Sequence, residues 1–203
     1  MMRFLYDSLV EAAHDSQLIK DSVFSNETLQ SFSAERIDFN HVHFDKCRFI
    51  QCDFSHASFL HVYMDTCDFS NCTFADSYWK ECEITDCKAN GAVFEHATLR
   101  SVKINNTPCR YINLSQSLLD NCQIIGCDLQ DSALSQMKIK QTSFDNVDFR
   151  HSDFFKTSLK GVDLSACRIE GILISDTFSE LRGMKIDAAQ APYIVSYLGV
   201  IIK

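Results

Sequence analysis

The chain of 203 residues has few of the residues that mark linkers and unstructured arrays, because it contains only two prolines and six glycines. Collagen-like and low-complexity proteins contain far more of both. It also lacks any run of about eighteen apolar residues, the length that a membrane-spanning helix needs. The N-terminal stretch MMRFLYDSLVEAAHDS carries acids in its apolar half and no small-residue cleavage site. We therefore expect no signal peptide.

Positive charge is also scarce, since 27 acidic residues outweigh 19 lysines and arginines and give a formal net charge of −8. This balance argues against direct binding of nucleic acid and leaves room for a basic partner. Cysteine, in contrast, is frequent, with ten residues. Secreted scaffolds held by disulfides are usually shorter and still richer in cysteine. Without an export signal, we expect reduced thiols in a cytoplasmic protein.

The dominant feature of the sequence is a large apolar residue at every fifth position. This frame covers 28 positions from Phe39 to Ile174, and only Ala89 and Cys109 lack a large apolar side chain. The residue two positions earlier is mostly small, and the residue between is often polar. A period of five fits neither a helix nor a plain strand. The aromatic part of the expected core consists of Phe44, Phe49, Phe54, Phe59, Phe69, Phe74, Trp79 and Phe94.

Strand geometry explains the period. In a short extended segment, alternate side chains share a face, so a small and a large residue point inward around one outward polar residue. The two remaining residues turn a corner, and stacked coils pair their backbones at about 4.8 Å per layer. The sequence thus predicts one uninterrupted solenoid. The period alone does not decide between three and four sides, although cysteines 47, 67, 87, 127 and 167 differ by multiples of twenty and favour four.

The pattern small–Asp/Asn–Leu/Phe–x–x resembles the pentapeptide-repeat proteins over residues 22–176. This resemblance implies an all-β fold, a right-handed quadrilateral β-helix with four repeats per coil and about seven coils. Trp79, Ala89 and Cys109, which follows Pro108, are irregular in size for the frame. We therefore expect a bulge or bend within residues 77–111.

The two ends of a solenoid expose apolar side chains and need caps. Residues 1–21 are expected to form an N-terminal capping helix or segment, with a partner-recruiting arm as the alternative. The expected apolar stripe of this helix consists of Phe4, Leu5, Leu9, Ala12 and Ala13.

Residues 177–203 leave the frame and predict a C-terminal helix followed by a short strand. Asp187 and Gln190 have the spacing of a capping box, and Pro192 favours a helix that starts after Asp187. The apolar face of this segment could pair with a second copy. We expect the dimer interface to include Ile194, Val195, Leu198, Val200, Ile201 and Ile202.

The C-terminal segment also resembles one branch of the family. The residues that carry the likeness to the quinolone-resistance (Qnr) proteins are Gly183, Lys185, Ile186, Asp187, Gln190, Ala191, Leu198, Gly199, Val200 and the stretch CKANGAVF at 87–94. This resemblance, which extends to the related MfpA and McbG proteins, implies a homodimeric rod that binds DNA gyrase or topoisomerase IV. Such proteins protect the enzyme from quinolones or a peptide toxin, and MfpA-like members act as DNA mimics. Many Qnr proteins carry loops that interrupt the repeat, and this sequence does not.

Charge is unevenly distributed along the frame. Residues 37–100 carry a net charge of −5 and residues 101–176 a net charge of −1. We expect the partner-binding surface to be acidic and to include Asp45, Asp65, Asp68, Asp76, Glu81, Glu83 and Asp86. Spacings of twenty predict that Asp45 and Asp65 stack on adjacent coils. The same arithmetic predicts a basic column of Lys80, Arg100, Lys140 and Lys160, which no uniform DNA-like charge would contain.

The cysteines and histidines, which could bind metals or react, are explained by packing and by ordinary surface polarity. The inward position of nine cysteines predicts buried thiols that act as small apolar residues, and not a zinc site. His41 and His61 share an expected column, which ordinary surface polarity explains. A tube filled with phenylalanine leaves no cavity for a substrate. We expect no enzyme, catalytic residue, cofactor or metal. Besides a topoisomerase-binding rod, two alternatives remain: immunity against a gyrase-directed peptide toxin, and a general interaction scaffold or secreted effector.

Overall fold

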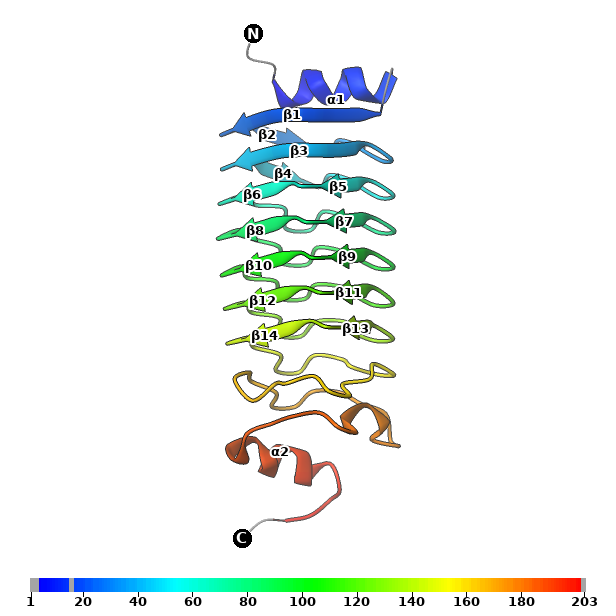
Figure 1. The fold of residues 1–203 in the computed structure, drawn as a ribbon, viewed down its shortest axis with the longest axis vertical. Helices are drawn as coiled ribbons and strands as arrows, with labels where there is room; N and C mark the ends of the chain where they lie inside the picture. Colours follow the sequence, from blue (N-terminus) through cyan, green and yellow to red (C-terminus); the bar gives the residue numbers. More distant parts are fainter. Residues whose placement is uncertain (1–3, 15–16, 202–203) are drawn as a thin grey trace.

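The computed structural model describes residues 4–14 and 17–201 and shows a rod built from stacked coils (Figure 1). Helix α1 (Leu5–His14) lies at one end of the rod, and helix α2 (Ala191–Ser196) lies at the other. Neither helix has the length and apolar character that crossing a membrane requires, and the same holds for every helix in the described part of the chain.

The strands are short and parallel. They are β1 (Leu18–Ser25), β2 (Thr28–Gln30), β3 (Asp38–Asp45), β4 (Arg48–Ile50), β5 (Ser58–Leu60), β6 (Tyr63–Asp65), β7 (Tyr78–Lys80), β8 (Glu83–Thr85), β9 (Thr98–Arg100), β10 (Lys103–Asn105), β11 (Leu118–Asp120), β12 (Gln123–Ile125), β13 (Lys138–Lys140) and β14 (Ser143–Asp145). Two 3-10 helices, η1 (Ser179–Leu181) and η2 (Ala188–Gln190), follow the strands.

Each strand pairs with the strand twenty residues later, so each coil contains four five-residue repeats. Phe39 lies opposite Phe59, which in turn lies opposite Trp79. The Phe54 N–H donates to Thr73 O at 2.8 Å, and the Thr73 N–H donates to Cys52 O at 3.1 Å. The structure thus confirms a four-sided parallel β-solenoid. Its regular strands extend over about six turns, and isolated bridges continue the stack toward the C-terminus.

We number the four sides in chain order. The first side carries the start of β1 and β3 and then β5, β7, β9, β11 and β13, and the second side carries the remainder of β1 and β3 and then β6, β8, β10, β12 and β14. The third side holds the β2–β4 pair and isolated bridges, such as Arg48 with Asp68. The fourth side holds isolated bridges alone, such as Asp53 with Thr73.

The corners between sides use left-handed backbone at every fifth residue along most of the rod. Residues at these corners have φ near +55°, for example 57° at Asn71 and 56° at Asp76. Asn, Asp and Gly tolerate this conformation better than other residues, and they occupy many corners. A non-glycine residue in this region costs on the order of 1 kcal/mol. The ladder of backbone hydrogen bonds between coils offsets that cost.

Aromatic rings stack along the rod axis and fill its N-terminal half. The ring centroids of Phe39 and Phe59 are 4.9 Å apart, and those of Phe54 and Phe74 are 5.0 Å apart. Trp79 is fully buried and stacks on Phe59 at 3.8 Å. Its indole N–H donates to the Ser77 hydroxyl at 2.8 Å, which satisfies the one polar atom of the ring.

The expected bulge within residues 77–111 is wrong. Strands β7, β9 and β11 keep the twenty-residue register, and Pro108 bridges Asp128 in the same parallel manner as its neighbours. The small serine at position 77 accepts the indole hydrogen bond and leaves space for the larger ring of Trp79. Size differences are therefore absorbed by side chains, and the backbone stays regular.

All ten cysteines are free and buried, as the repeat predicts. Burial raises the pKa of Cys82, Cys127 and Cys167 to about 11. The Cys82 thiol donates to Phe59 O at 3.2 Å. These groups therefore remain protonated at neutral pH and pack as small apolar residues.

The solenoid extends further than residues 22–176. Pairing begins at Leu18, which lies opposite Asp38, and it continues to a bridge between Asp163 and Lys185. That last bridge spans 22 residues instead of 20, because two extra residues are inserted in the final coil. The extra residues fall in the segment that includes Phe178, whose backbone is left-handed, and the start of η1. The sequence shows that the five-residue frame changes in this region. It does not show that backbone pairing between coils resumes after the change.

The N-terminal helix caps the rod as expected, with a narrower apolar face. Leu5, Leu9 and Ala12 are buried against the first coil. Phe4 is 65% exposed and Ala13 is also exposed, so their assignment to the buried stripe is wrong. The Leu5 N–H donates to the Glu27 carboxylate at 2.7 Å, which ties the start of the helix to the first coil.

At the C-terminal end, Gln190 closes the last coil. The capping box is confirmed: the Gln190 N–H donates to Asp187 at 3.0 Å and the Asp187 N–H donates to the Gln190 side chain at 2.9 Å. The Gln190 amide also donates to the carbonyl oxygens of Leu164 and Cys167, at 2.9 and 2.6 Å. Helix α2 then starts at Ala191, with Pro192 in its first turn.

The predicted C-terminal strand is not found among the residues that the structure describes. Val200 and Ile201 form no strand, and Ile202 lies outside the described residues. The Tyr197 hydroxyl donates to Ile172 O at 2.6 Å and fixes the end of α2 under the rod.

Replacing Gln190 with alanine is expected to lower the free energy of unfolding by about 2 kcal/mol, because it leaves the Cys167 carbonyl oxygen and the Asp187 N–H without partners. Thermal unfolding followed by circular dichroism measures the effect. Gln136→Ala is the matched control, since Gln136 is an exposed corner residue whose side chain has no hydrogen-bond partner among the described residues. Equal melting temperatures for the two variants would contradict the capping role.

Candidate interaction surfaces

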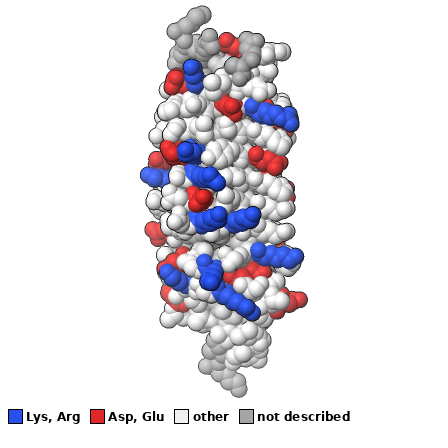
Figure 2. All heavy atoms as spheres, turned by 45° about the vertical axis from the view of Figure 1, so that its right-hand side comes forward, with Lys and Arg blue, Asp and Glu red and all other residues white. Residues whose placement is uncertain are grey.

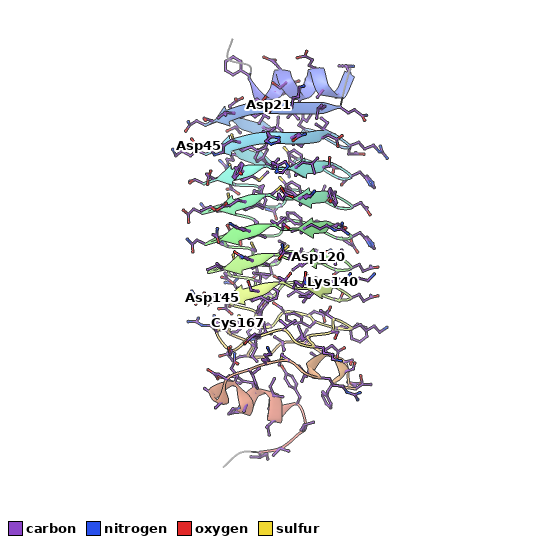
Figure 3. The ribbon with its side chains drawn as sticks, in the orientation of Figure 1. Asp21, Asp45, Asp120, Lys140, Asp145 and Cys167 are labelled. Atoms are coloured by element: carbon purple, nitrogen blue, oxygen red, sulfur yellow. The ribbon has the colours of Figure 1, made fainter. Side chains whose placement is uncertain are left out.

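Outward side chains of the solenoid form columns that run parallel to the rod axis. Residues twenty apart occupy one column, and neighbours in a column are about 4.8 Å apart. Figure 3 shows Asp45 and Asp145 pointing outward from the same edge of the rod, several coils apart. Both belong to one column of the second side, with Asp65, Thr85, Asn105 and Ile125 between them.

Five of the seven acidic residues singled out in the sequence lie on the second side or its two corners. Asp45 and Asp65 are opposite each other in adjacent coils, as predicted. Below them, the column continues with Thr85, and Asp86 lies beside it at the corner. Glu83 occupies β8 and Glu81 the preceding corner. We call this group the acidic strip: Asp45, Asp65, Glu81, Glu83 and Asp86.

The other two acids lie elsewhere. Asp68 is on the third side, where its register neighbours are Arg48 and Lys88. Asp76 is at the corner between the fourth and first sides. These two carboxylates therefore lie on other sides of the rod than the acidic strip.

Histidines accompany the acidic strip. The rings of His41 and His61 stack at 4.5 Å, as their expected shared column requires. His61 lies 3.2 Å from a carboxylate oxygen of Glu81, and His43 lies 2.7 Å from Asp65. Within residues 4–14 and 17–201, no three His, Cys, Asp or Glu side chains gather as metal ligands would.

The expected basic column is interrupted by an acid. Lys80 and Arg100 lie opposite each other, but the next position is Asp120, whose carboxylate is 3.8 Å from Arg100 Nε. Lys140 follows on the next coil, and Figure 3 shows it close to Asp120. Figure 2 shows Lys and Arg side chains gathered over the middle and lower part of the face turned toward the viewer. Charge on the first side is thus mixed in its middle coils and basic in its lower ones.

The third side carries an ion-pair network that the sequence pattern did not reveal. Asp148 accepts hydrogen bonds from Arg150 at 2.7 to 3.1 Å and lies 3.6 Å from Arg168. Arg110 and His151 both approach Asp131, at 3.0 and 3.6 Å. A shallow hollow of about 340 Å³ lies beside Asp148. Spacings of twenty and of two residues between oppositely charged residues within the frame are the sequence signal from which this network could have been found.

Comparison with known proteins places this fold. The family model described as "Pentapeptide repeats" matches residues 35–71 and 138–171, with eight copies. These two stretches of the chain are pentapeptide repeats. The remaining coils follow the same register between and around the matched stretches.

Solved structures were found that resemble this chain. A trypsin-treated variant of QnrB1, described as a plasmid-mediated fluoroquinolone resistance protein, is 22% identical, with a TM-score of 0.55, and the match covers 92% of this chain and 98% of QnrB1. HetL of the cyanobacterium Nostoc, described as involved in regulating heterocyst differentiation, is 11% identical with a TM-score of 0.40 over 91% and 93% of the two chains. No curated protein sequence matches the chain significantly. At 22% identity, the likeness to QnrB1 concerns the fold.

The Asp148 network is expected to stabilise the rod in a pH-dependent manner. Burial raises the pKa of Asp148, but the hydrogen bonds and charges of Arg150 and Arg168 outweigh it, so the pKa lies below its usual range. The stabilisation is present above the pKa of the unfolded chain, about 3.9, and is lost as pH falls through the lower folded pKa. Asp148→Asn should therefore cost about 1 kcal/mol at pH 7, and less below pH 4.

Urea unfolding at pH 7 and pH 3.5 tests this expectation. Asp145→Asn is the control, because Asp145 is exposed and has no ion pair with any described residue. A cost for Asp148→Asn that does not change between the two pH values would contradict it.

Proposed function

We propose that this rod binds DNA gyrase or topoisomerase IV and modulates the enzyme or protects it from quinolones. The observation that carries the proposal is the acidic strip, a group of five carboxylates on the second side of the rod and its corners, in which Asp45 and Asp65 are in register on adjacent coils. The resemblance of the C-terminal segment to the Qnr branch supports it. So does the fold shared with QnrB1, a fluoroquinolone resistance protein.

Charge limits the resemblance to DNA. One strand of duplex DNA carries a phosphate about every 3.4 Å of axis, and both strands together carry one charge per about 1.7 Å. Carboxylates in one column of the rod are about 4.8 Å apart at closest, and several positions in the Asp45 column are uncharged. The acidic strip is therefore shorter and less densely charged than a single phosphate backbone, and its mimicry of DNA is partial.

The C-terminal end is proposed as the dimer interface. Leu198, Val200 and Ile201 are 64, 53 and 84% exposed, an unusual exposure for three apolar side chains within four residues. Ile194 and Val195 are half-buried, and Ile194 packs against the core of the same chain. The exposed residues are thus those proposed to contact a second copy, whereas Ile194 also serves the cap.

A supercoiling assay with purified gyrase, with and without a fluoroquinolone, tests the proposed function. Wild-type protein at micromolar concentration is expected to change supercoiling or to relieve its inhibition. Asp45→Asn combined with Asp65→Asn should weaken that effect roughly tenfold, because it removes two adjacent carboxylates of a charged interface.

Asp153→Asn combined with Asp176→Asn is the matched control, since Asp153 lies on the fourth side, Asp176 is exposed outside the acidic strip, and the change in net charge is the same. No effect of the wild-type protein on either reaction would remove the proposal. Rescue from a gyrase-directed peptide toxin without rescue from quinolones would favour the immunity function, and a pull-down without topoisomerase subunits would favour a general scaffold.

Leu198→Asp is expected to convert a dimer into a monomer, because a buried charge at an apolar interface costs several kcal/mol. Light scattering of the purified protein measures the molar mass. Val23→Asp is the control, since Val23 is 66% exposed near the opposite end of the rod. A dimer that survives Leu198→Asp would place the interface elsewhere.

A further inference from the structure

A basic hollow lies at the C-terminal end of the first side, beside the two-residue insertion. It has a volume of about 450 Å³. Its lining includes the basic side chains of Lys156, Lys160 and Arg182 and the hydroxyl groups of Ser158 and Ser179. Part of its lining, Ser179 and Arg182, belongs to the segment in which the spacing between paired residues changes from 20 to 22. The hollow thus lies where the regular repeat ends in the described chain.

The cations around this hollow differ from most others on the rod. Lys80, Arg100, Arg110 and Arg150 each lie within 4 Å of a carboxylate. Lys156, Lys160 and Arg182 have no ion pair among the residues that the structure describes. Lys138 and Lys140, on the strand above, have none there either, and both are exposed. Five unpaired cations therefore gather at one end of a chain whose net charge is −8.

Glu180 is the one carboxylate in the lining, and its oxygens are already bonded. It accepts hydrogen bonds from the Lys156 N–H at 2.8 Å and from the Ser175 hydroxyl at 2.8 Å, and it is 2% exposed. It thus holds the inserted segment against the preceding corner, and it offsets one of the surrounding positive charges. The Lys156 ammonium lies 4.9 Å from the centre of the Phe155 ring, which keeps it beside the hollow.

We propose that this basic hollow binds phosphate groups. A guanidinium offers a planar fork of N–H donors, and lysines add point charges, which together suit the acceptor oxygens of phosphate. The Ser158 hydroxyl, whose oxygen accepts from the Lys160 N–H, adds a further donor. Lys138 and Lys140 extend the positive surface along the rod, so the site takes phosphates linked in series, as in polyphosphate or a nucleic-acid backbone. This site is independent of the acidic strip and of the proposed topoisomerase partner.

The negative net charge of the chain argued against contact with nucleic acid at the level of sequence. That argument concerns the sum of charges, whereas binding depends on the local potential. The acidic strip lies on the second side toward the N-terminal end, and the hollow lies on the first side toward the C-terminal end. The two surfaces are therefore on different sides of the rod and several coils apart.

Binding of tripolyphosphate and of a short DNA duplex at low salt tests the proposal, by calorimetry for the first and fluorescence anisotropy for the second. Wild-type protein is expected to bind at least one of them. Lys160→Gln combined with Arg182→Gln should weaken binding roughly tenfold. For the duplex, the slope of the logarithm of affinity against the logarithm of salt concentration should become shallower by about 0.9 for each phosphate that the variant no longer neutralises.

Lys88→Gln combined with Lys103→Gln is the matched control, because both lysines are exposed, carry no ion pair in the described chain and lie on other sides of the rod. This control should bind as the wild type does. Binding of tripolyphosphate alone identifies free phosphate chains as the ligand, and binding of both probes identifies a nucleic-acid backbone as a ligand. No binding of either probe, or an equal loss in both double variants, would overturn the proposal.

Discussion

The constraint on which the rest of the structure depends is the in-register stacking of twenty-residue coils. Each coil donates and accepts backbone hydrogen bonds with the coils above and below, as at Phe54, Thr73 and Cys52. This register can be kept only if every corner turns in the same way, hence the left-handed residue at nearly every fifth position. It also forces the inward residues into continuous stacks, such as Phe39, Phe59 and Trp79. Outside the rod, the same register turns separate sequence positions into columns.

The period of the sequence predicts the inside of this rod well, because an inward residue has one role and a narrow range of sizes. The buried cysteines and the Asp187–Gln190 capping box were predicted for this reason, and the structure confirms both. The bulge expected around Trp79 was wrong, because Ser77 provides room and a hydrogen bond for the indole ring. The burial of Phe4 was wrong as well, since the orientation of α1 depends on how it docks on the first coil.

The outer surface is less predictable, because a column is defined by spacing but its charge depends on which side chains pair. Spacing alone predicted that Asp45 and Asp65 would be neighbours. The same spacing places Asp120 between Arg100 and Lys140, and Arg168 beside Asp148, but it does not show which of these charges come close enough to pair. The hollow beside Glu180 lies at a two-residue insertion, and the frame of the sequence gives no indication that pairing resumes after it. Function on such a rod is therefore decided by local pairing and by breaks in the repeat.

The proposed function requires that the acidic strip contacts the topoisomerase. Carboxyl footprinting tests it directly: carbodiimide labelling of aspartate and glutamate is measured by mass spectrometry with and without gyrase. The account predicts protection of Asp45, Asp65, Glu83 and their neighbours on the second side, recurring at intervals of about twenty residues along the sequence. Asp153 on the fourth side and Asp128 on the third should be labelled equally in both samples. Protection that is absent, uniform or confined to another side would contradict the account.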